Sequence, residues 1–276
     1  MQQLASHGAW RARLVLGFEA RGGRTVLAHK RQLGPLTVQR PFHPEGSPCH
    51  AYLLHPPGGI VGGDRLEIEA RIAPEAHALL TQPGATKGYR SAGATAVQQQ
   101  CLTVADRGVL EWLPQELILF PGARLRSSTK VVLEGGARFI GWELLSLGRP
   151  VIGERFLPGR ADLQLTIERD GRPLLIERLG IDDGRGLDGP SGLRGLPVSG
   201  TLVAAGADAG ELAAARQVLA ERAEFAVGAT LLGDLLAVRA LAHGIEPVMH
   251  CFRALWQALR PRLLGIDASL PRIWAT

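Results

Sequence analysis

The chain has 276 residues, of which 46% are hydrophobic and 21% are charged. This length supports a substantial hydrophobic core, and the balance excludes an intrinsically disordered or fibrous protein. The formal net charge of +5 is spread along the chain without a basic block, and aromatic residues make up only 5%, which argues against a nucleic-acid-binding protein.

The cysteines and the N-terminal residues bear on the cellular compartment. Cys49, Cys101 and Cys251 lie far apart, and three cysteines give no disulfide framework. The N-terminal residues contain no sustained apolar stretch of the signal-peptide type, and no apolar run approaches the ~18 residues that a membrane span requires. We therefore expect a cytoplasmic protein without a membrane partner.

Short strands, punctuated by glycine or proline, are predicted for most of the first 200 residues. Residues 65–72 are the clearest case, because their apolar residues alternate strictly with charged ones. A hairpin is predicted over residues 161–182, with its turn at Asp170-Gly171. The other segments expected to contain strands are 10–20, 25–42, 49–55, 77–82, 96–106, 108–120, 124–135 and 138–148.

The last quarter of the chain differs in pattern. Residues 209–223 are rich in strong helix formers and predict a helix. Its apolar face consists of Leu212, Ala215, Leu219 and Ala223. Two short strands are expected around Gly233-Asp234.

The clearest predicted helix covers residues 245–265. Pro247 fits its first turn, whereas Pro261 indicates that the regular helix weakens or ends there. Its apolar stripe packs against its own domain or in a partner's groove. The stripe is formed by Ile245, Val248, Met249, Phe252, Leu255, Trp256, Leu259 and Leu263.

Many strands with few helical intervals predict a mainly β fold of antiparallel or mixed architecture. We expect a single domain over residues 1–276, with the helical part at about 207–265. Residues 182–200 are rich in glycine and predict a disordered loop, an excursion within that domain.

A glycine-rich stretch runs from Leu53 to Leu66. It is a poor phosphate loop, because Asp64 stands after Gly63 where a P-loop needs lysine, and a strand follows it instead of a helix. The pairs Gly58-Gly59 and Gly62-Gly63 suit a bend with positive φ values or close backbone approach, and Asp64 is able to bond a turn amide.

Histidines and cysteines occur without the spacing of a structural zinc site. They lie in two groups: His43, Cys49, His50 and His55, and His250 with Cys251. Cys49 and His50 point to opposite faces of a predicted strand, so they cannot readily share one metal. Buried single side chains are the simpler interpretation, and the roles of Cys49, His50, His250 and Cys251 stay open.

Carboxylates on predicted strands are the remaining candidates for chemistry. They are Glu111, Glu116, Glu143 and Glu177. A pair of them acts in acid–base catalysis only if the fold brings the two together. Otherwise they are exposed strand carboxylates.

Lys87, Tyr89 and Arg90 cluster beside Gly84 and Gly88. The cluster fits a docking surface that combines charge with an aromatic anchor. It fits a β-turn flanked by solvated charges equally well.

Several motifs, in order, resemble one family. They are "CHAYLLHPPGGIVGGDRL", "ALLTQPGATKGYRS", "LEWLPQELILFPGARL" and "GWELLSLGRP" followed by "GERF". This set, over roughly residues 10–180, is similar to the urease accessory protein UreD, also called UreH. The resemblance implies a sheet-rich, stacked, β-helix-like fold with a few helices, mostly in the C-terminal quarter.

The resemblance also implies a function without catalysis. Such a protein binds the urease apoprotein and, with UreF as direct partner and UreG joined through UreF, supports nickel insertion. Nickel is then an ion in transit through an internal passage, and no cofactor is tightly bound. Loosely held oxygen ligands suit transit better than a closed His/Cys cage.

Matching the family motifs residue by residue gives the candidate passage lining. It consists of Asp64, Thr86, Glu143 and Glu177. Two alternatives stay open: an adaptor that binds without conducting metal, and a hydrolase or lyase that uses a carboxylate pair such as Glu143 and Glu177.

Overall fold

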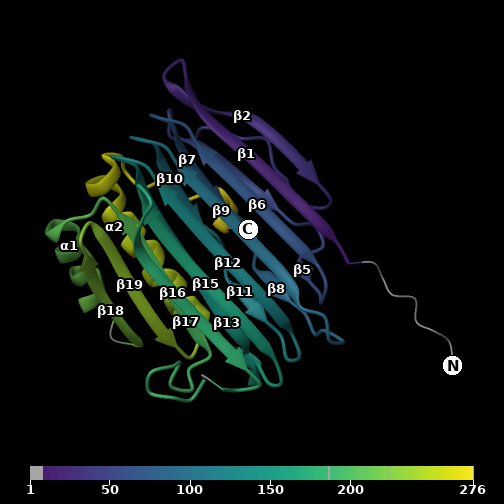
Figure 1. Ribbon diagram of the computed structural model, residues 1–276. Helices are drawn as coiled ribbons and strands as arrows, with labels where there is room; N and C mark the ends of the chain where they lie inside the picture. Colours follow the sequence, from purple (N-terminus) through teal and green to yellow (C-terminus); the bar gives the residue numbers. More distant parts are fainter. Residues whose placement is uncertain (1–8, 186, 223, 276) are drawn as a thin grey trace.

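The computed structural model describes residues 9–275 apart from 186 and 223, and most of them lie in two facing β-sheets (Figure 1). We call the first the open sheet; its strand order is β16-β15-β12-β9-β6-β1-β2. Its strands are β1 (Arg11–Arg21), β2 (Arg24–Leu33), β6 (Arg65–Ile72), β9 (Ala96–Val104), β12 (Arg124–Leu133), β15 (Arg160–Arg169) and β16 (Arg172–Asp182).

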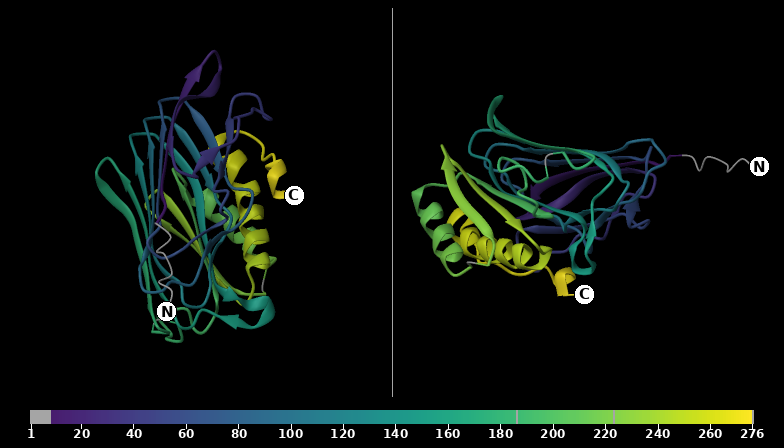
Figure 2. Two further views of the ribbon diagram at one scale, coloured as in Figure 1. Left: turned by 90° about the vertical axis from the view of Figure 1, so that its right-hand side faces the viewer. Right: turned by 90° about the horizontal axis from the view of Figure 1, so that it is seen from below.

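We call the second the helix-backed sheet; its order is β18-β19-β17-β13-β10-β7-β4-β3. Its strands are β3 (Thr37–Val38), β4 (Cys49–Leu54), β7 (His77–Thr81), β10 (Val109–Leu113), β13 (Arg138–Arg149), β17 (Val198–Ala205), β18 (Ala226–Leu232) and β19 (Leu235–Ala242). A short strand, β14 (Glu154–Arg155), pairs with the end of β13. Seen from below, the helices cover the outer side of this sheet and leave the other sheet's outer face uncovered (Figure 2).

The chain forms a solenoid, because it alternates between the two sheets coil after coil. Between them it passes a short third face made of β5 (Gly59–Ile60), β8 (Thr86–Gly88), β11 (Leu117–Leu119) and the end of β13. Successive coils stack, so the central strands of both sheets pair in parallel. The predicted sheet-rich, β-helix-like stack is therefore confirmed, and the pairing is mixed.

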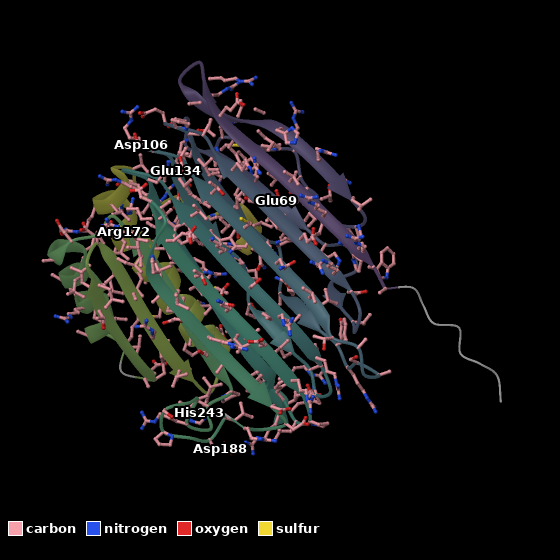
Figure 3. The ribbon with its side chains drawn as sticks, viewed as in Figure 1. Glu69, Asp106, Glu134, Arg172, Asp188 and His243 are labelled. Carbon is pink, nitrogen blue, oxygen red and sulfur yellow. The ribbon has the colours of Figure 1, made fainter. Side chains whose placement is uncertain are left out.

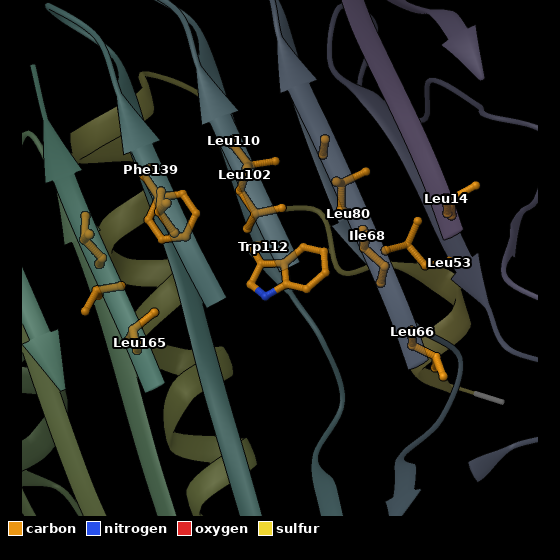
Figure 4. Packing of buried hydrophobic residues seen from close by; sticks show 14 of the residues in the cluster. Leu14, Leu53, Leu66, Ile68, Leu80, Leu102, Leu110, Trp112, Phe139 and Leu165 are labelled. Atoms are coloured by element: carbon orange, nitrogen blue, oxygen red, sulfur yellow. The ribbon is translucent and has the colours of Figure 1, made fainter. Parts of the chain in front are cut away.

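Alternating side chains produce this packing. Along β6, the apolar residues are buried and the charged ones face outward, where Figure 3 shows Glu69. The inward side chains of the two sheets, Leu66, Ile68, Leu80 and Leu102 among them, pack against each other in the core of Figure 4. Burial of these side chains is the main stabilising contribution.

Antiparallel hairpins end the open sheet on both sides. β2 pairs with β1 and β16 pairs with β15, each with a β-bulge in the hairpin. The second hairpin turns at Asp170 (φ 49°) and Gly171 (φ 76°), as predicted, because this turn needs positive φ at both positions. The two strands expected around Gly233 are β18 and β19.

The helices lie in the C-terminal part, as predicted. α1 (Ala209–Ala220) begins with a capping box formed by Asp208 and Glu211, and the predicted apolar position Ala223 lies outside the described residues. The 3-10 turns η1 (Pro150–Ile152) and η2 (Arg272–Ala275) are short. No helix in the described part of the chain is long and apolar enough to cross a membrane.

α2 (Ile245–Leu264) packs its apolar stripe on the helix-backed sheet, so its own domain covers that stripe. The regular helix was expected to weaken or end at Pro261, but α2 continues to Leu264. Proline removes only one N–H there, and the amide of Gly265 (φ 71°) closes the last turn on the Pro261 carbonyl oxygen at 3.0 Å.

Residues 182–200 also differ from the prediction. Between β16 and β17, the described residues form consecutive turns, and two of their leucines, Leu187 and Leu193, are buried in the core between the sheets. Disorder was predicted from the glycine content, but these two apolar anchors hold the loop against the solenoid. Figure 3 shows Asp188 on this loop, at the end of the molecule opposite Asp106 and Glu134.

Candidate functional site

A cavity of about 770 Å³ lies between the two sheets. The open sheet contributes, from β9, β12 and β16, the polar side chains Gln98, Gln100, Ser127 and Glu177. The helix-backed sheet contributes, from β13, β17 and β19, the side chains Glu143, Thr201 and Arg239. Polar groups thus face each other inside a fold whose inward positions are mostly apolar.

Strand register explains how these residues meet. Glu143, Thr201 and Arg239 are register partners on three neighbouring strands. On the facing sheet, Gln100 and Thr129 are register partners. Because side chains at paired positions of one sheet face share a side, each row presents its polar groups to the other row.

Thr129 links the two rows. Its hydroxyl contacts Gln100 Oε1 at 3.1 Å and makes a short hydrogen bond with Glu143 Oε1. A hydroxyl has only one hydrogen. When Thr129 donates it to Gln100, the bond to Glu143 needs a proton on the carboxyl; when Glu143 is ionised, Thr129 donates to Glu143 instead.

The pKa of Glu143 matches this arrangement. Burial raises it to about 7, the bond from Thr129 opposes the rise, and the negative charge of Glu177 adds to it. Both forms of Glu143 are therefore populated near neutral pH. The carboxyl is able to exchange a proton for a metal cation, because ionisation costs little at that pH.

Glu177 has a different environment on the same cavity. Thr201 donates to Glu177 Oε2 at 3.1 Å, and Arg239 forms a short ion pair with Glu177 Oε1. The two carboxylates therefore have unequal neighbours. One has a neutral hydroxyl partner, and the other has a cationic one.

Amides and Thr86 extend the lining away from the carboxylates. Thr86 begins β8 and lines the cavity with Gln82 and Gln115. Gln98 is only 9% exposed, and its side-chain oxygen has no hydrogen-bond partner among the described residues. An unpaired buried acceptor is costly, so this oxygen is suited to a donor or a cation in the cavity.

The structure therefore brings three of the four predicted lining residues together on one cavity: Thr86, Glu143 and Glu177. It places Asp64 elsewhere. The Asp64 carboxylate is 4% exposed and accepts from the amides of Val61 and Trp10, each at 2.9 Å. In this position it fastens the glycine bend to the start of β1.

The glycines of the bend are required by geometry. Gly58 and Gly63 have φ values of 72° and 95°. A Cβ on Gly59 would stand 2.3 Å from the Tyr89 ring, and one on Gly62 would stand 2.0 Å from Ser91 Oγ. The stretch is a β-bend that lets neighbouring coils approach closely, as the sequence indicated.

We expect Asp64→Ala to lower the free energy of unfolding by about 1–2 kcal/mol, because two part-buried amides lose their acceptor. Urea denaturation measures the change. Asp64→Asn keeps one acceptor oxygen, so its free energy of unfolding should lie between that of Asp64→Ala and that of the unsubstituted chain. A variant as stable as the unsubstituted chain would contradict the role of the Asp64 carboxylate in holding the bend.

A second polar cluster, beneath α2, was not predicted. Glu111 on β10 is fully buried and bonds to Arg260, Trp256 and His77 at 2.6–3.0 Å. Arg260 also binds Glu45 at 2.5 and 2.9 Å. Burial opposes ionisation of Glu111, but the bonds from His77 and Arg260 outweigh it and lower its pKa to about 2.

This cluster fastens α2 and the segment after it to the sheet. Glu45 also accepts from the amide of Ser269 at 3.1 Å and contacts His50 Nε2 at 3.2 Å. Glu111 and Glu45 each bond Arg260 and one histidine, on the outer side of the helix-backed sheet. The cluster therefore has a structural role, and Glu111 is neither an exposed strand carboxylate nor a cavity residue.

In the described part of the chain, cysteines and histidines lie outside the cavity lining. Cys49 packs in the core between the sheets while His50 faces Glu45, so the two point to opposite faces as predicted. Cys251 is a buried residue of α2, and Cys101 is exposed. Across residues 9–275 without 186 and 223, no group of three or more His, Cys, Asp or Glu side chains is arranged to hold a metal ion.

Tyr89 lies on the third face. Its ring stacks on Phe120, with centroids 5.2 Å apart, and it remains 38% exposed. The Arg149 guanidinium lies 5.0 Å from the Phe120 ring centroid. The docking role predicted for Lys87, Tyr89 and Arg90 stays a prediction.

The fold and the cavity define a class: a two-sheet β-solenoid with a polar, carboxylate-containing cavity between its sheets. A sequence profile described as "UreD urease accessory protein" matches residues 10–275. The chain belongs to this family of urease accessory proteins, as its motifs indicated, and the family has an accessory role and not a catalytic one.

Curated relatives cover nearly the full chain. The urease accessory protein UreD of Pseudomonas putida (strain W619) is 48% identical over 276 residues, covering 100% of this chain and 98% of the relative. That of Alcanivorax borkumensis is 47% identical over 275 residues, covering 98% and 94%. That of Klebsiella aerogenes is 48% identical over 267 residues, covering 97% of each.

Proposed function

We propose that this chain acts in urease maturation by supporting nickel insertion into the urease apoprotein, and that nickel passes through the cavity between its sheets. In this proposal UreF binds the chain directly, UreG joins through UreF, and the complex works in the cytoplasm. Membership of the urease accessory family supports the general role. The observation that carries the route is the cavity lined by Glu143, Glu177 and Thr86.

The chemistry of the lining favours a passing divalent cation. Carboxylate, hydroxyl and amide oxygens replace water around a cation without the tight binding of a thiolate or imidazole cage. Glu143 contributes one negative charge that is readily gained or lost near neutral pH. An ion is thus attracted into the cavity and still able to leave it.

A reconstituted activation tests this route. The purified chain is combined with urease apoprotein, UreF, UreG, GTP, bicarbonate and nickel, and the nickel content of the urease is measured by mass spectrometry. We expect Glu143→Gln to reduce the rate of nickel loading about fivefold, since one carboxylate–cation contact is worth on the order of 1 kcal/mol or more.

Glu168→Gln is the matched control. Glu168 is a strand carboxylate on the outer face of the open sheet, paired with Lys130 at 2.9 Å. The control should load nickel normally, and both variants should bind urease and UreF like the unsubstituted chain. Normal loading by Glu143→Gln would favour an adaptor that conducts no metal. Loss of complex formation would show that the substitution acts on docking instead.

A further inference from the structure

The rim of the cavity holds an ion pair that the proposed nickel route must pass. Arg239 lies on β19, and 46% of its side chain is exposed. It lines the cavity together with residues 226–228 of β18 and residues 191–193 of the loop between β16 and β17. Its guanidinium bonds Glu177, whose other carboxylate oxygen accepts from Thr201.

Arg239 is the cation that meets the cavity carboxylates. Among the described lining residues, the other positive side chain is Arg178, and its guanidinium is bound to Asp162 at 2.8 and 3.1 Å. Glu143 has no cationic partner among its bonds. The negative charge of the cavity is therefore compensated at Glu177 by one guanidinium.

The other acceptor oxygens of the cavity, on Gln98, Gln100 and Glu143, outnumber the hydrogen-bond donors that contact them. Gln98 is nine-tenths buried with an unpartnered oxygen, and Glu143 and Gln100 share the single hydroxyl hydrogen of Thr129. Such a surplus of acceptors fits a cation deeper in the cavity than Arg239.

Space for movement exists beside Arg239. Its register partner on β18 is Gly228, and a Cβ placed on Gly228 would have no neighbour within 4 Å. The guanidinium therefore has room to leave Glu177 for solvent on the side of β18. A flexible arginine stem pays little to turn outward when its head is already half in water.

We propose that Arg239 is the exchangeable counter-ion of the cavity: an entering divalent metal cation displaces its guanidinium from Glu177, which then serves the metal together with Glu143. This inference rests on the proposed nickel route. Displacement favours a doubly charged ion over a singly charged one, because attraction to a carboxylate scales with charge. It also weakens metal binding, since breaking the ion pair opposes entry, and weak binding allows release.

Titration of the full chain with nickel chloride in a calorimeter tests the proposal. Removing the competing cation should tighten nickel binding, so we expect Arg239→Gln to lower the Kd about fivefold at unchanged stoichiometry. Arg239→Met keeps the apolar stem and should show the same direction, which separates loss of charge from loss of packing. Arg126→Gln, which replaces an exposed arginine on the outer face of the open sheet, is the matched control and should bind nickel like the unsubstituted chain.

The outcomes separate the two proposals. Unchanged or weaker binding in both Arg239 variants, with weaker binding in Glu143→Gln, would overturn the counter-ion role and leave the nickel route standing. If Glu143→Gln and Glu177→Gln also bind nickel like the unsubstituted chain, the cavity takes no nickel and both proposals fail. Tighter binding in the Arg239 variants that is abolished by adding Glu177→Gln supports the counter-ion role.

Discussion

Replacing Glu111 by Gln is expected to lower the free energy of unfolding by about 3 kcal/mol, the low end of the cost of breaking a buried ion pair. Glu111 and Arg260 are both fully buried. Without the carboxylate, the Arg260 guanidinium keeps only Glu45 as an ionised partner, and no water reaches it to compensate. The tryptophan that also bonds Glu111, Trp256, provides a fluorescence signal for urea denaturation.

Glu75→Gln is the comparison for this prediction. Glu75 also pairs with an arginine, Arg107, but 59% and 67% of the two side chains are exposed. An exposed pair contributes at most about 1 kcal/mol, so this variant should stay close to the unsubstituted chain. Equal stability of the two variants would show that the cluster beneath α2 does not fasten the helix.

The same cluster predicts that the free energy of unfolding decreases in acid. The pKa of Glu111 is lowered from its ordinary value of 4.5 to about 2 in the folded protein, so its stabilising effect is present above pH 4.5. It is lost as the pH falls from 4.5 toward 2. Glu111→Gln should therefore lose less stability than the unsubstituted chain over that interval.

Replacing Glu143 by Gln is expected to have the opposite effect on stability to replacing Glu111. It should raise the free energy of unfolding by about 2 kcal/mol at pH 8. The folded pKa of about 7 lies above the ordinary value of 4.5, because burial disfavours the charged form. Stability associated with the neutral acid is full below pH 4.5 and is lost as the pH rises through 7. Glutamine does not ionise, so the variant does not lose this stability. Solvent in the cavity lowers the cost of ionising Glu143, so the gain in unfolding free energy is smaller than the full pKa shift implies.

Urea denaturation at pH 5 and pH 8 measures this effect. The difference between Glu143→Gln and the unsubstituted chain should be small at pH 5 and larger at pH 8. Glu168→Gln, on the outer face, is the comparison at both pH values. A Glu143 variant that is less stable at both pH values would mean that the carboxylate is retained for packing. Greater stability with slower nickel loading is the pattern of a residue kept for function.

Local patterns determined how much of the fold could be predicted. The alternation along β6 and the Asp170-Gly171 turn depend on neighbouring residues, and both are as predicted. Parallel stacking of coils was implied only by the family resemblance, because the residues paired in parallel register lie between 28 and 54 positions apart. The loop 182–200 was misjudged since its two buried leucines need a partner surface that no local pattern reveals.

The candidate site shows the same limit. Glu143 and Glu177 share a cavity because their strands belong to facing sheets, which spacing alone does not indicate. Asp64 was grouped with them through its motif, but its carboxylate bonds the amide of Val61 in the same bend and that of Trp10, 54 positions away. Arg260 lies 149 positions from Glu111, so their pairing could not be predicted. A signal existed: Arg260 follows Trp256 by four residues, on the apolar stripe of the helix.

The bulged antiparallel hairpins at both ends of the open sheet have a consequence for assembly. Stacked parallel coils offer an unpaired edge onto which another copy of the chain could add, as in a fibre. β2 and β16 reverse direction, carry bulges that twist the strand, and bear exposed Arg31 and Arg178. These features oppose growth by edge addition at either terminus of the stack, so the solenoid remains finite.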